Sequence, residues 1–269
     1  MNKAKKIFRY WRARLRPSTS LPFFWHVGKP NFGDDINPAF FRAAIDRDVR
    51  LQTRRNLPHF LGMGSILDRA TSSSTVLGSG CMLRPITGSL TPHHVVAVRG
   101  ELSLAGLARP EGVLLGDPMV LLNLIAPCEP KRDGYVGFVP HVSELGRSLR
   151  MDIPGIKIIN PSLEPWRVIH EIAACSRIYS QSLHGLIVAD SLEIPNVWIA
   201  PGPLMAGDTF KFFDYFSTLD TDKEPYRFDL ETFTQTPVQA FNVGRYKHDK
   251  QIYLDAIRSA VSAQSQDVT

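Results

Sequence analysis

Short runs of β-branched or aromatic residues alternate with amphipathic stretches from residue 21 to about residue 200. This alternation is typical of an α/β fold, because parallel strands need crossover connections that are usually helices. We expect strands at residues 21–26, 59–62, 75–78, 94–98, 113–115, 135–139, 156–159, 177–180 and 196–200. We expect helices at residues 38–45, 101–107, 143–151, 165–175, 183–192 and 247–263.

The composition changes at residues 126–134, where proline and charged residues separate an apolar run from a new strand. Such a segment is typical of a linker between domains. We therefore expect an N-terminal α/β domain at residues 21–128 and a C-terminal one at residues 134–263, which ends in a helix. Ligands of open parallel sheets bind at the carboxyl ends of the strands, so the predicted site lies in a cleft between the domains.

The net charge of +5 comes from one end of the chain. Seven bases and no acids lie within residues 1–16, so the rest carries 24 of the 31 bases against all 26 acids. That remainder offers no broad positive surface for a phosphate backbone, and nucleic acid is not an expected partner. The three cysteines are widely spaced and form no C-x-x-C pair, so no metal site is expected.

Residues 1–20 form a basic amphipathic segment ahead of the first domain. Ile7, Trp11 and Leu15 share one helical face among the bases of residues 3–16, which favours an anionic membrane surface as the partner. Docking on a protein surface and disorder are the alternatives. No secretory h-region follows, and no apolar run is long enough to span a bilayer, so a cytoplasmic location is expected.

Polar residues with catalytic potential follow the first predicted strand. Gly33 permits a sharp turn, and two adjacent carboxylates, Asp34 and Asp35, come next. An acid before a helix is often an N-cap, but Asn37 precedes Pro38 and is expected to cap this helix instead. At least one of the aspartates is therefore predicted to belong to a site.

Two glycine patterns follow later strands, Gly62-Met63-Gly64-Ser65 and Gly78-Ser79-Gly80. Either could bring backbone amides close to an anion, although tight turns explain them equally well. Both lack the third glycine of the dinucleotide fingerprint, so no nicotinamide or flavin cofactor is expected. Arg99 ends a further strand, where it could grip a carboxylate or phosphate in the cleft or pair with Glu101 or another acid.

His184 stands where a strand gives way to a helix, within Ser182-Leu183-His184-Gly185. A helix N-terminus disfavours imidazolium, so the pKa of His184 should be low and the ring neutral near pH 7. A neutral imidazole can exchange protons with a hydroxyl, although lone histidines are more often structural. His141 follows the first strand of the second half, and Lys211 lies among aromatics at residues 210–216 that could stack on a sugar or form core.

These motifs occur in a characteristic order along the chain: Asn31-Phe32-Gly33-Asp34, Gly64-Ser65, Gly78-Ser79-Gly80, Val98-Arg99-Gly100, Gly116-Asp117-Pro118, Val139-Pro140-His141 and Ser182-Leu183-His184-Gly185. In this the chain resembles the polysaccharide pyruvyl transferase family, in particular the bacterial ketal-pyruvate transferases of exopolysaccharide assembly. The resemblance covers about residues 21–220. It implies two Rossmann-like domains in a GT-B-like arrangement, with the active site in the inter-domain cleft.

The resemblance also implies phosphoenolpyruvate as donor substrate, no cofactor, a lipid-linked oligosaccharide or other glycan as acceptor, and the inner face of the plasma membrane as location. The family's functional aspartate, arginine and histidine match Asp34, Arg99 and His184. We expect His184 and Asp34 to share the proton transfers, and Arg99 and the helix start to hold the donor. The residues expected to bind substrate are Asn31, Gly33, Asp35, Gly64, Ser65, Gly80, His141, Ser182 and Lys211.

One position departs from the family pattern. Many members carry an arginine two residues before the histidine, where this chain has Ser182. A second cation for the donor is then needed, and Lys211 is the candidate. Two other functions stay open: a GT-B glycosyltransferase that uses a nucleotide sugar, and a non-catalytic assembly factor held at the membrane by its basic segment.

Overall fold

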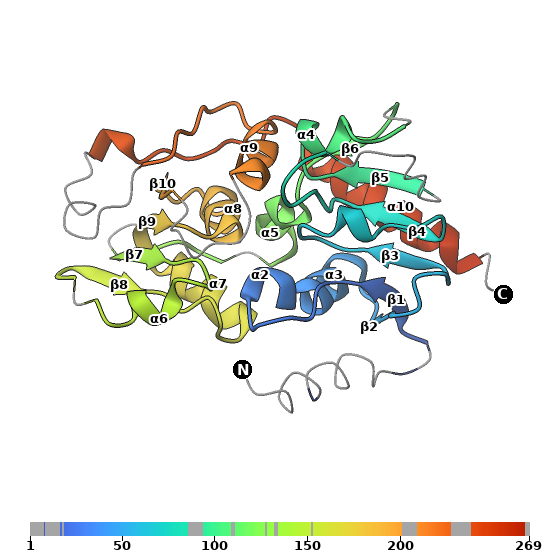
Figure 1. The fold of residues 1–269 in the computed structure, drawn as a ribbon, viewed down its shortest axis with the longest axis horizontal. Helices are drawn as coiled ribbons and strands as arrows, with labels where there is room; N and C mark the ends of the chain where they lie inside the picture. Colours follow the sequence, from blue (N-terminus) through green and yellow to red (C-terminus); the bar gives the residue numbers. More distant parts are fainter. Residues whose placement is uncertain are drawn as a thin grey trace.

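The computed structural model describes residues 8, 17, 19–85, 94–108, 111–126, 128–131, 134–151, 153–200, 209–226 and 238–266. Apart from Phe8, the basic stretch of residues 3–16 lies outside this part of the chain. Figure 1 shows two groups of strands side by side along the long axis, with helices packed around them. The parallel pairing of all the strands confirms the expected α/β class.

The first sheet has the order β2-β1-β3-β4-β5-β6. Its strands are β1 (Leu21–Phe24), β2 (Val49–Leu51), β3 (His59–Leu61), β4 (Ser74–Leu77), β5 (His94–Val98) and β6 (Leu114–Leu115). The helices along this half are α2 (Phe32–Asp35), α3 (Asn37–Ile45), η1 (Leu67–Arg69), α4 (Glu101–Leu104), η2 (Pro118–Leu121) and α5 (Leu122–Ile125).

The second sheet has the order β10-β9-β7-β8. Its strands are β7 (Tyr135–Val139), β8 (Ile156–Ile158), β9 (Cys175–Ser180) and β10 (Asn196–Trp198). The remaining helices are α6 (Leu145–Ser148), α7 (Pro165–Ala173), α8 (Leu183–Ser191), α9 (Phe210–Phe216), η4 (Val238–Ala240) and α10 (Lys250–Gln266).

Both sheets place their first strand between the second and the third along the chain. This is the order of flavodoxin-like sheets and differs from the 3-2-1-4-5-6 order of the dinucleotide-binding Rossmann fold. The chain changes direction across the sheet between β1 and β3 and again between β7 and β9. Ligands of such sheets bind beyond the carboxyl ends of the strands at these switch points, so each sheet has one favoured place for a site.

The C-terminal helix returns to the first half of the molecule. Helix α10 packs against α3, β5 and η2, and Figure 1 shows it running behind β4 and β5. The Tyr253 hydroxyl on α10 donates to the carbonyls of Leu77 and Gly116 at 2.9 and 2.8 Å. The last helix, which was expected to complete the second domain, is therefore bound to the first sheet, while the proposed division at residues 128–134 stays a prediction.

The aromatic stretch at residues 210–216 forms helix α9, which the sequence analysis did not predict. Its buried Phe212 stacks on Trp198 with ring centroids 4.8 Å apart, and Phe216 meets the same indole edge-on at 5.1 Å. These rings belong to the core and not to a sugar-binding platform. Packing of this apolar side fixes α9 against the second sheet and so positions Lys211 and Asp214 on its other sides.

Candidate active site

Asp34 lies in the short helix α2, which follows β1 after the loop of residues 25–31. The Asn31 side chain donates to Asp34 Oδ2 at 3.0 Å, and the Asn31 amide donates to Asp35 Oδ2 at 3.1 Å. Burial raises the pKa of Asp34, while the nearby His184 and His26 oppose the rise. A carboxyl group in this environment is easier to protonate than one in water, as a proton-transferring acid needs to be.

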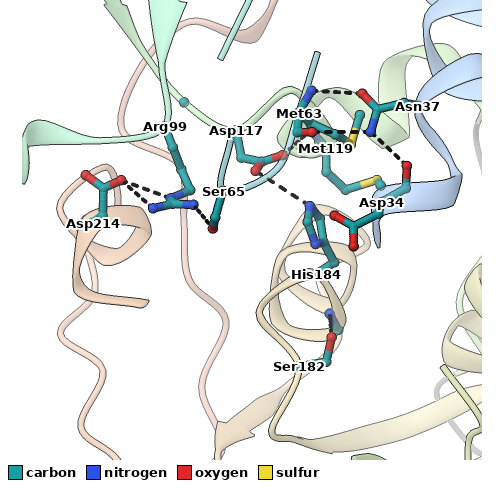
Figure 2. Close-up of polar contacts among 12 residues, drawn as sticks. Asp34, Asn37, Met63, Ser65, Arg99, Asp117, Met119, Ser182, His184 and Asp214 are labelled. Atoms are coloured by element: carbon teal, nitrogen blue, oxygen red, sulfur yellow. Dashed lines mark hydrogen bonds and ion pairs between the residues drawn. The ribbon is translucent and has the colours of Figure 1, made fainter. Parts of the chain in front are cut away.

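Asn37 does not cap helix α3 as expected, because it is itself the first residue of that helix. Its side chain accepts from the Met63 amide at 2.9 Å and donates to the Met63 and Asp34 carbonyls at 3.2 and 3.0 Å (Figure 2). Asn37 thereby ties α2 to the loop after β3. Gly64 in that loop has φ of +118°, a conformation that favours glycine.

His184 lies in the first turn of α8, where the sequence analysis placed it. Ser182 is the N-cap residue and accepts from the Gly185 amide at 3.4 Å. Gly33 allows α2 to approach the imidazole, since a Cβ atom at Gly33 would lie 2.1 Å from His184 Nδ1. Burial lowers the pKa of His184 to about 4, with Arg99 and Lys211 adding to the decrease and Asp34 opposing it. The ring is thus neutral near pH 7.

Arg99 does not project into an open cleft. Its side chain is fully buried and forms an ion pair with Asp214, with Nη2 at 2.8 Å and Nε at 2.9 Å from Oδ2. Nη1 donates to the Ser65 hydroxyl at 2.8 Å, and Nη2 also donates to the Cys81 carbonyl. The expectation that Arg99 reaches into the cleft is therefore wrong. Arg99 instead forms the ion pair that was the alternative, and its partner is Asp214 and not Glu101.

Gly80 lies against this ion pair and not against an open anion site. A Cβ atom at Gly80 would lie 2.5 Å from Arg99 Cζ. Asp214 receives two further bonds, from the Ser103 amide at 2.8 Å and the Ser103 hydroxyl at 2.6 Å. The pair is thus closed on all sides within the described residues, and it joins α9 to the end of β5.

Lys211 is the buried cation that faces open space. Only 8% of it is exposed, and its Nζ lies 5.3 Å from the centroid of the Phe212 ring. Among the described residues no carboxylate forms an ion pair with it. Burial, together with the positive charge of Arg99, lowers the pKa of Lys211 to about 8. His141, whose Nδ1 lies 2.8 Å from the Ser143 hydroxyl, has its pKa lowered to about 4 by burial and by Lys211.

One cavity of about 680 Å³ brings most of these residues together. The predicted residues that line it are Asn31, Asp34, Ser65, His141, Ser182, His184 and Lys211. They follow β1 and β3 in the first sheet and β7 and β9 in the second, or belong to α9. Both switch points thus open onto one space, which is large enough for a small-molecule ligand. Of the other predicted residues, Gly33, Asp35, Gly64, Gly80 and Arg99 are not among its lining.

A second cavity of equal volume carries none of the predicted residues. It is lined by residues that include Arg177, Asp190, Arg245, Tyr246 and Lys250. Asp190 is engaged there with Lys223 at 3.0 Å and with the Asn196 side chain at 2.6 Å. Volume alone therefore does not select a site, and we base the choice on the titratable groups of the first cavity.

Asp117 was not predicted as a site residue. It is fully buried, and its Oδ2 lies 3.7 Å from His184 Nε2 (Figure 2). In the sequence, an aspartate before a proline resembles an ordinary N-cap, and Asp117 does cap η2 by accepting from the Met119 amide at 3.0 Å. The motif Gly116-Asp117-Pro118 gave the only sequence signal for this residue, and it did not indicate a contact with His184.

The comparisons with known proteins concern the family and not the individual site residues. The family model described as polysaccharide pyruvyl transferase matches residues 84–203, a range that includes Arg99, Asp117, His141 and His184. Over these residues the chain is similar to the polysaccharide pyruvyl transferase family, in agreement with the resemblance that the motifs indicated.

Two relatives are similar over most of their length. Succinoglycan biosynthesis protein ExoV of Rhizobium meliloti (strain 1021) is 28% identical over 233 residues, which cover 81% of this chain and 71% of that protein. Uncharacterized protein L143 of Acanthamoeba polyphaga mimivirus is 27% identical over 219 residues, which cover 76% of each chain. No solved structure gives a significant match. In the described part of the chain, no helix has both the length and the apolar character that crossing a bilayer requires.

Proposed function

We propose that this protein is a pyruvyl transferase of exopolysaccharide biosynthesis that moves pyruvate from phosphoenolpyruvate onto two hydroxyls of a sugar as a cyclic ketal. The observation that carries the proposal is that Asp34, His184 and Lys211, from three separate elements, line one cavity. The family match and the similarity to the succinoglycan biosynthesis protein support the reaction class. Neither finding favours a nucleotide-sugar donor or a non-catalytic assembly role.

The reaction needs an anion-binding group and groups that exchange protons. The methylene carbon of phosphoenolpyruvate gains a proton, a sugar hydroxyl oxygen bonds to C2, and the bond from C2 to the phosphate oxygen breaks. The neighbouring hydroxyl then attacks C2 and closes the ketal. The two hydroxyls release two protons, of which the methyl group keeps one and inorganic phosphate the other.

The lining of the cavity supplies groups suited to these steps. Lys211 and the N-terminus of α8 are proposed to hold the carboxylate and phosphate of the donor, since a desolvated ammonium and free helical amides both favour anions. His184 is neutral at pH 7 and Asp34 has a raised pKa, so the two can accept and donate protons in turn. Arg99 is proposed to fix Ser65 at the cavity wall and not to contact the donor.

The acceptor is proposed to be a lipid-linked oligosaccharide or another glycan, presented at the inner face of the plasma membrane. The basic segment at residues 3–16 would hold the protein at that surface. Co-sedimentation with vesicles that contain anionic lipid tests this part. Binding that persists after residues 1–16 are removed would contradict the role given to the segment.

The donor is tested by incubating the purified protein and a glycan acceptor with phosphoenolpyruvate or with nucleotide sugars, in separate reactions. Mass spectrometry of the acceptor and an assay for free phosphate provide the two readouts. We expect phosphate release that depends on the acceptor, together with an acceptor mass increased by one ketal-linked pyruvate. Release of a nucleoside diphosphate from a nucleotide sugar would contradict the proposal.

A further inference from the structure

Two buried polar atoms next to the cavity face each other without a hydrogen bond. His184 Nε2 and Asp117 Oδ2 are both buried, and neither has a hydrogen-bond partner in the described part of the chain. They lie 3.7 Å apart, with the ring between Asp117 and Asp34 (Figure 2). Buried polar atoms are rarely left unpaired, and such an atom in a native structure calls for an explanation.

The other carboxylate oxygen of Asp117 is already engaged. Asp117 Oδ1 accepts from the Met119 amide at 3.0 Å, which fixes the carboxylate at the start of η2. Oδ2 is then left facing the imidazole as the free acceptor. Burial raises the pKa of Asp117 to about 6, while the hydrogen bond from the Met119 amide and the charge of Arg99 oppose the rise, so the carboxylate form is favoured at pH 7. An ionised carboxylate can only accept, and the imidazole atom that faces it must be a donor to satisfy it.

We propose that Asp117 is a positioning residue that holds His184 in the tautomer with the proton on Nε2, so that Nδ1 exchanges the proton with the substrate. The 3.7 Å separation shortens to a hydrogen bond when the ligand orders the ring, as catalytic contacts often do on substrate binding. This inference rests on the proposed function for its role in turnover, but not for the tautomer itself.

The exposure of the histidine agrees with this assignment. About 10% of the His184 side chain is accessible, and Nε2 does not belong to the accessible part, because that atom is buried. Nδ1 lies close to Gly33 of α2, where a Cβ atom would lie 2.1 Å from it. Nδ1 is not among the buried polar atoms without a partner in the described part of the chain, whereas Nε2 is. The proposal therefore assigns Nδ1, and not Nε2, to the sugar hydroxyl.

The charged groups around the ring act on its protonation in opposite directions. Asp34 favours an imidazolium, whereas Arg99 and Lys211 disfavour it. When Nδ1 takes the proton of an attacking hydroxyl, the positive charge that forms on the ring is met by Asp117 through the Nε2 proton. Asp117 remains a carboxylate throughout, and its contribution is to orient the ring and stabilise its charged form.

The tautomer can be measured without substrate, by nitrogen-15 NMR of histidine-labelled protein at pH 7, with His184 assigned from the signals missing in His184→Gln. We expect a protonated Nε2 and an unprotonated Nδ1 in the wild-type chain. The opposite tautomer in the wild-type chain would overturn the proposal even if the protein transfers pyruvate. The expected tautomer in a protein without pyruvyl transfer would leave the Asp117 contact standing and refute only the proposed function.

The second arm uses Asp117→Asn, which keeps the oxygen that accepts from Met119 and replaces the free oxygen with an amide donor. This amide should move the His184 proton to Nδ1 and lower kcat by about 10²–10⁴, the usual size of a general acid–base contribution. The matched control is Asp249→Asn, because exposed Asp249 caps α10 by accepting from two amides. An Asp117→Asn protein with wild-type tautomer and kcat would overturn the proposal.

Discussion

Two buried cations, Arg99 and Lys211, differ in what surrounds them. Arg99 is fully enclosed, and Asp214, Ser65 and Cys81 take up its donors. Lys211 is almost as buried, but it lines a cavity and no described carboxylate pairs with it. Burying a charge costs free energy unless the charge is paired. A buried cation with a carboxylate partner therefore indicates a structural role, whereas a buried cation without one that lines a cavity indicates a site for an anionic ligand. Of the two cations, Lys211 is the one that lines the cavity, and the proposed function therefore assigns the donor to Lys211 and not to Arg99.

The largest effect on turnover is expected for His184, which lines the same cavity as Lys211. His184→Ala should lower turnover by about 10²–10⁴, because it removes a proton-transferring group and leaves only binding. Steady-state kinetics of phosphate release measure the change, and His170→Ala, in an exposed histidine of α7, is the control. Near-wild-type turnover of His184→Ala would contradict the proton-transferring role proposed for His184.

Removing one partner of the Arg99–Asp214 ion pair should mainly lower the free energy of unfolding. Arg99→Met leaves Asp214 as a buried charge without its cation, and removal of one partner from a buried pair costs about 3–5 kcal/mol of unfolding free energy. Urea denaturation followed by circular dichroism gives the value. The double variant Arg99→Met/Asp214→Leu should recover part of this loss, because no buried charge remains. If Arg99→Met instead kept its stability and lost donor binding, Arg99 would be the donor cation after all.

Replacing Lys211 should weaken donor binding but stabilise the fold, which is the opposite of the stability change expected for Arg99. Lys211→Met should raise the KM for phosphoenolpyruvate by about tenfold or more, the scale of one charge-assisted hydrogen bond. It should also raise the unfolding free energy at pH 7 by up to about 3 kcal/mol, since the pKa of Lys211 falls from 10.5 to about 8 and each unit corresponds to about 1.36 kcal/mol. Parallel kinetics and denaturation measure both, and a less stable protein with unchanged KM would contradict the assignment.

The smallest expected effect is a change in the pH dependence of kcat/KM, which reports the charge of Lys211. The lowered pKa of Lys211 means that its charge is lost as the pH rises through about 8, so kcat/KM for the donor should decline above that pH. The lowered pKa of His184 keeps the ring neutral down to about pH 4. The proposed role of Asp117 needs its carboxylate form, and burial raises its pKa to about 6, so the acid limb should lie near pH 6. In Lys211→Arg the alkaline limb should disappear, because arginine stays charged. An unchanged alkaline limb would assign it to another group.

Much of the frame could be predicted because it depends on local patterns. The alternation of apolar runs and amphipathic stretches located nine of the ten strands in the described part of the chain, and the boundary between β9 and α8 placed His184 at a helix start. Strand β2 was missed because Val49–Leu51 alternates over only three residues, which is too short a run to distinguish from chance. Residues that follow strand ends, such as Asp34 and Ser65, meet in the cavity because parallel strands end on one side of a sheet.

The parts that could not be predicted depend on contacts between distant segments. Asp214 is 115 residues from Arg99 along the chain, and the aromatic sequence of α9 gave no period that would show which side faces the arginine. Asp117 caps η2 through one oxygen, but its second oxygen meets His184 only through the packing of α8 against η2. A local pattern can indicate one role of a side chain and still hide another.

The central claim is that the small anionic donor binds between Lys211, His184 and Asp34, and a crystal structure of the protein soaked with phosphoenolpyruvate tests it most directly. We predict density for the donor in the cavity shared by the two switch points, with an anionic oxygen within hydrogen-bond distance of Lys211 Nζ. Donor density in the second cavity, against Arg245 and Lys250, with the first one empty, would contradict it.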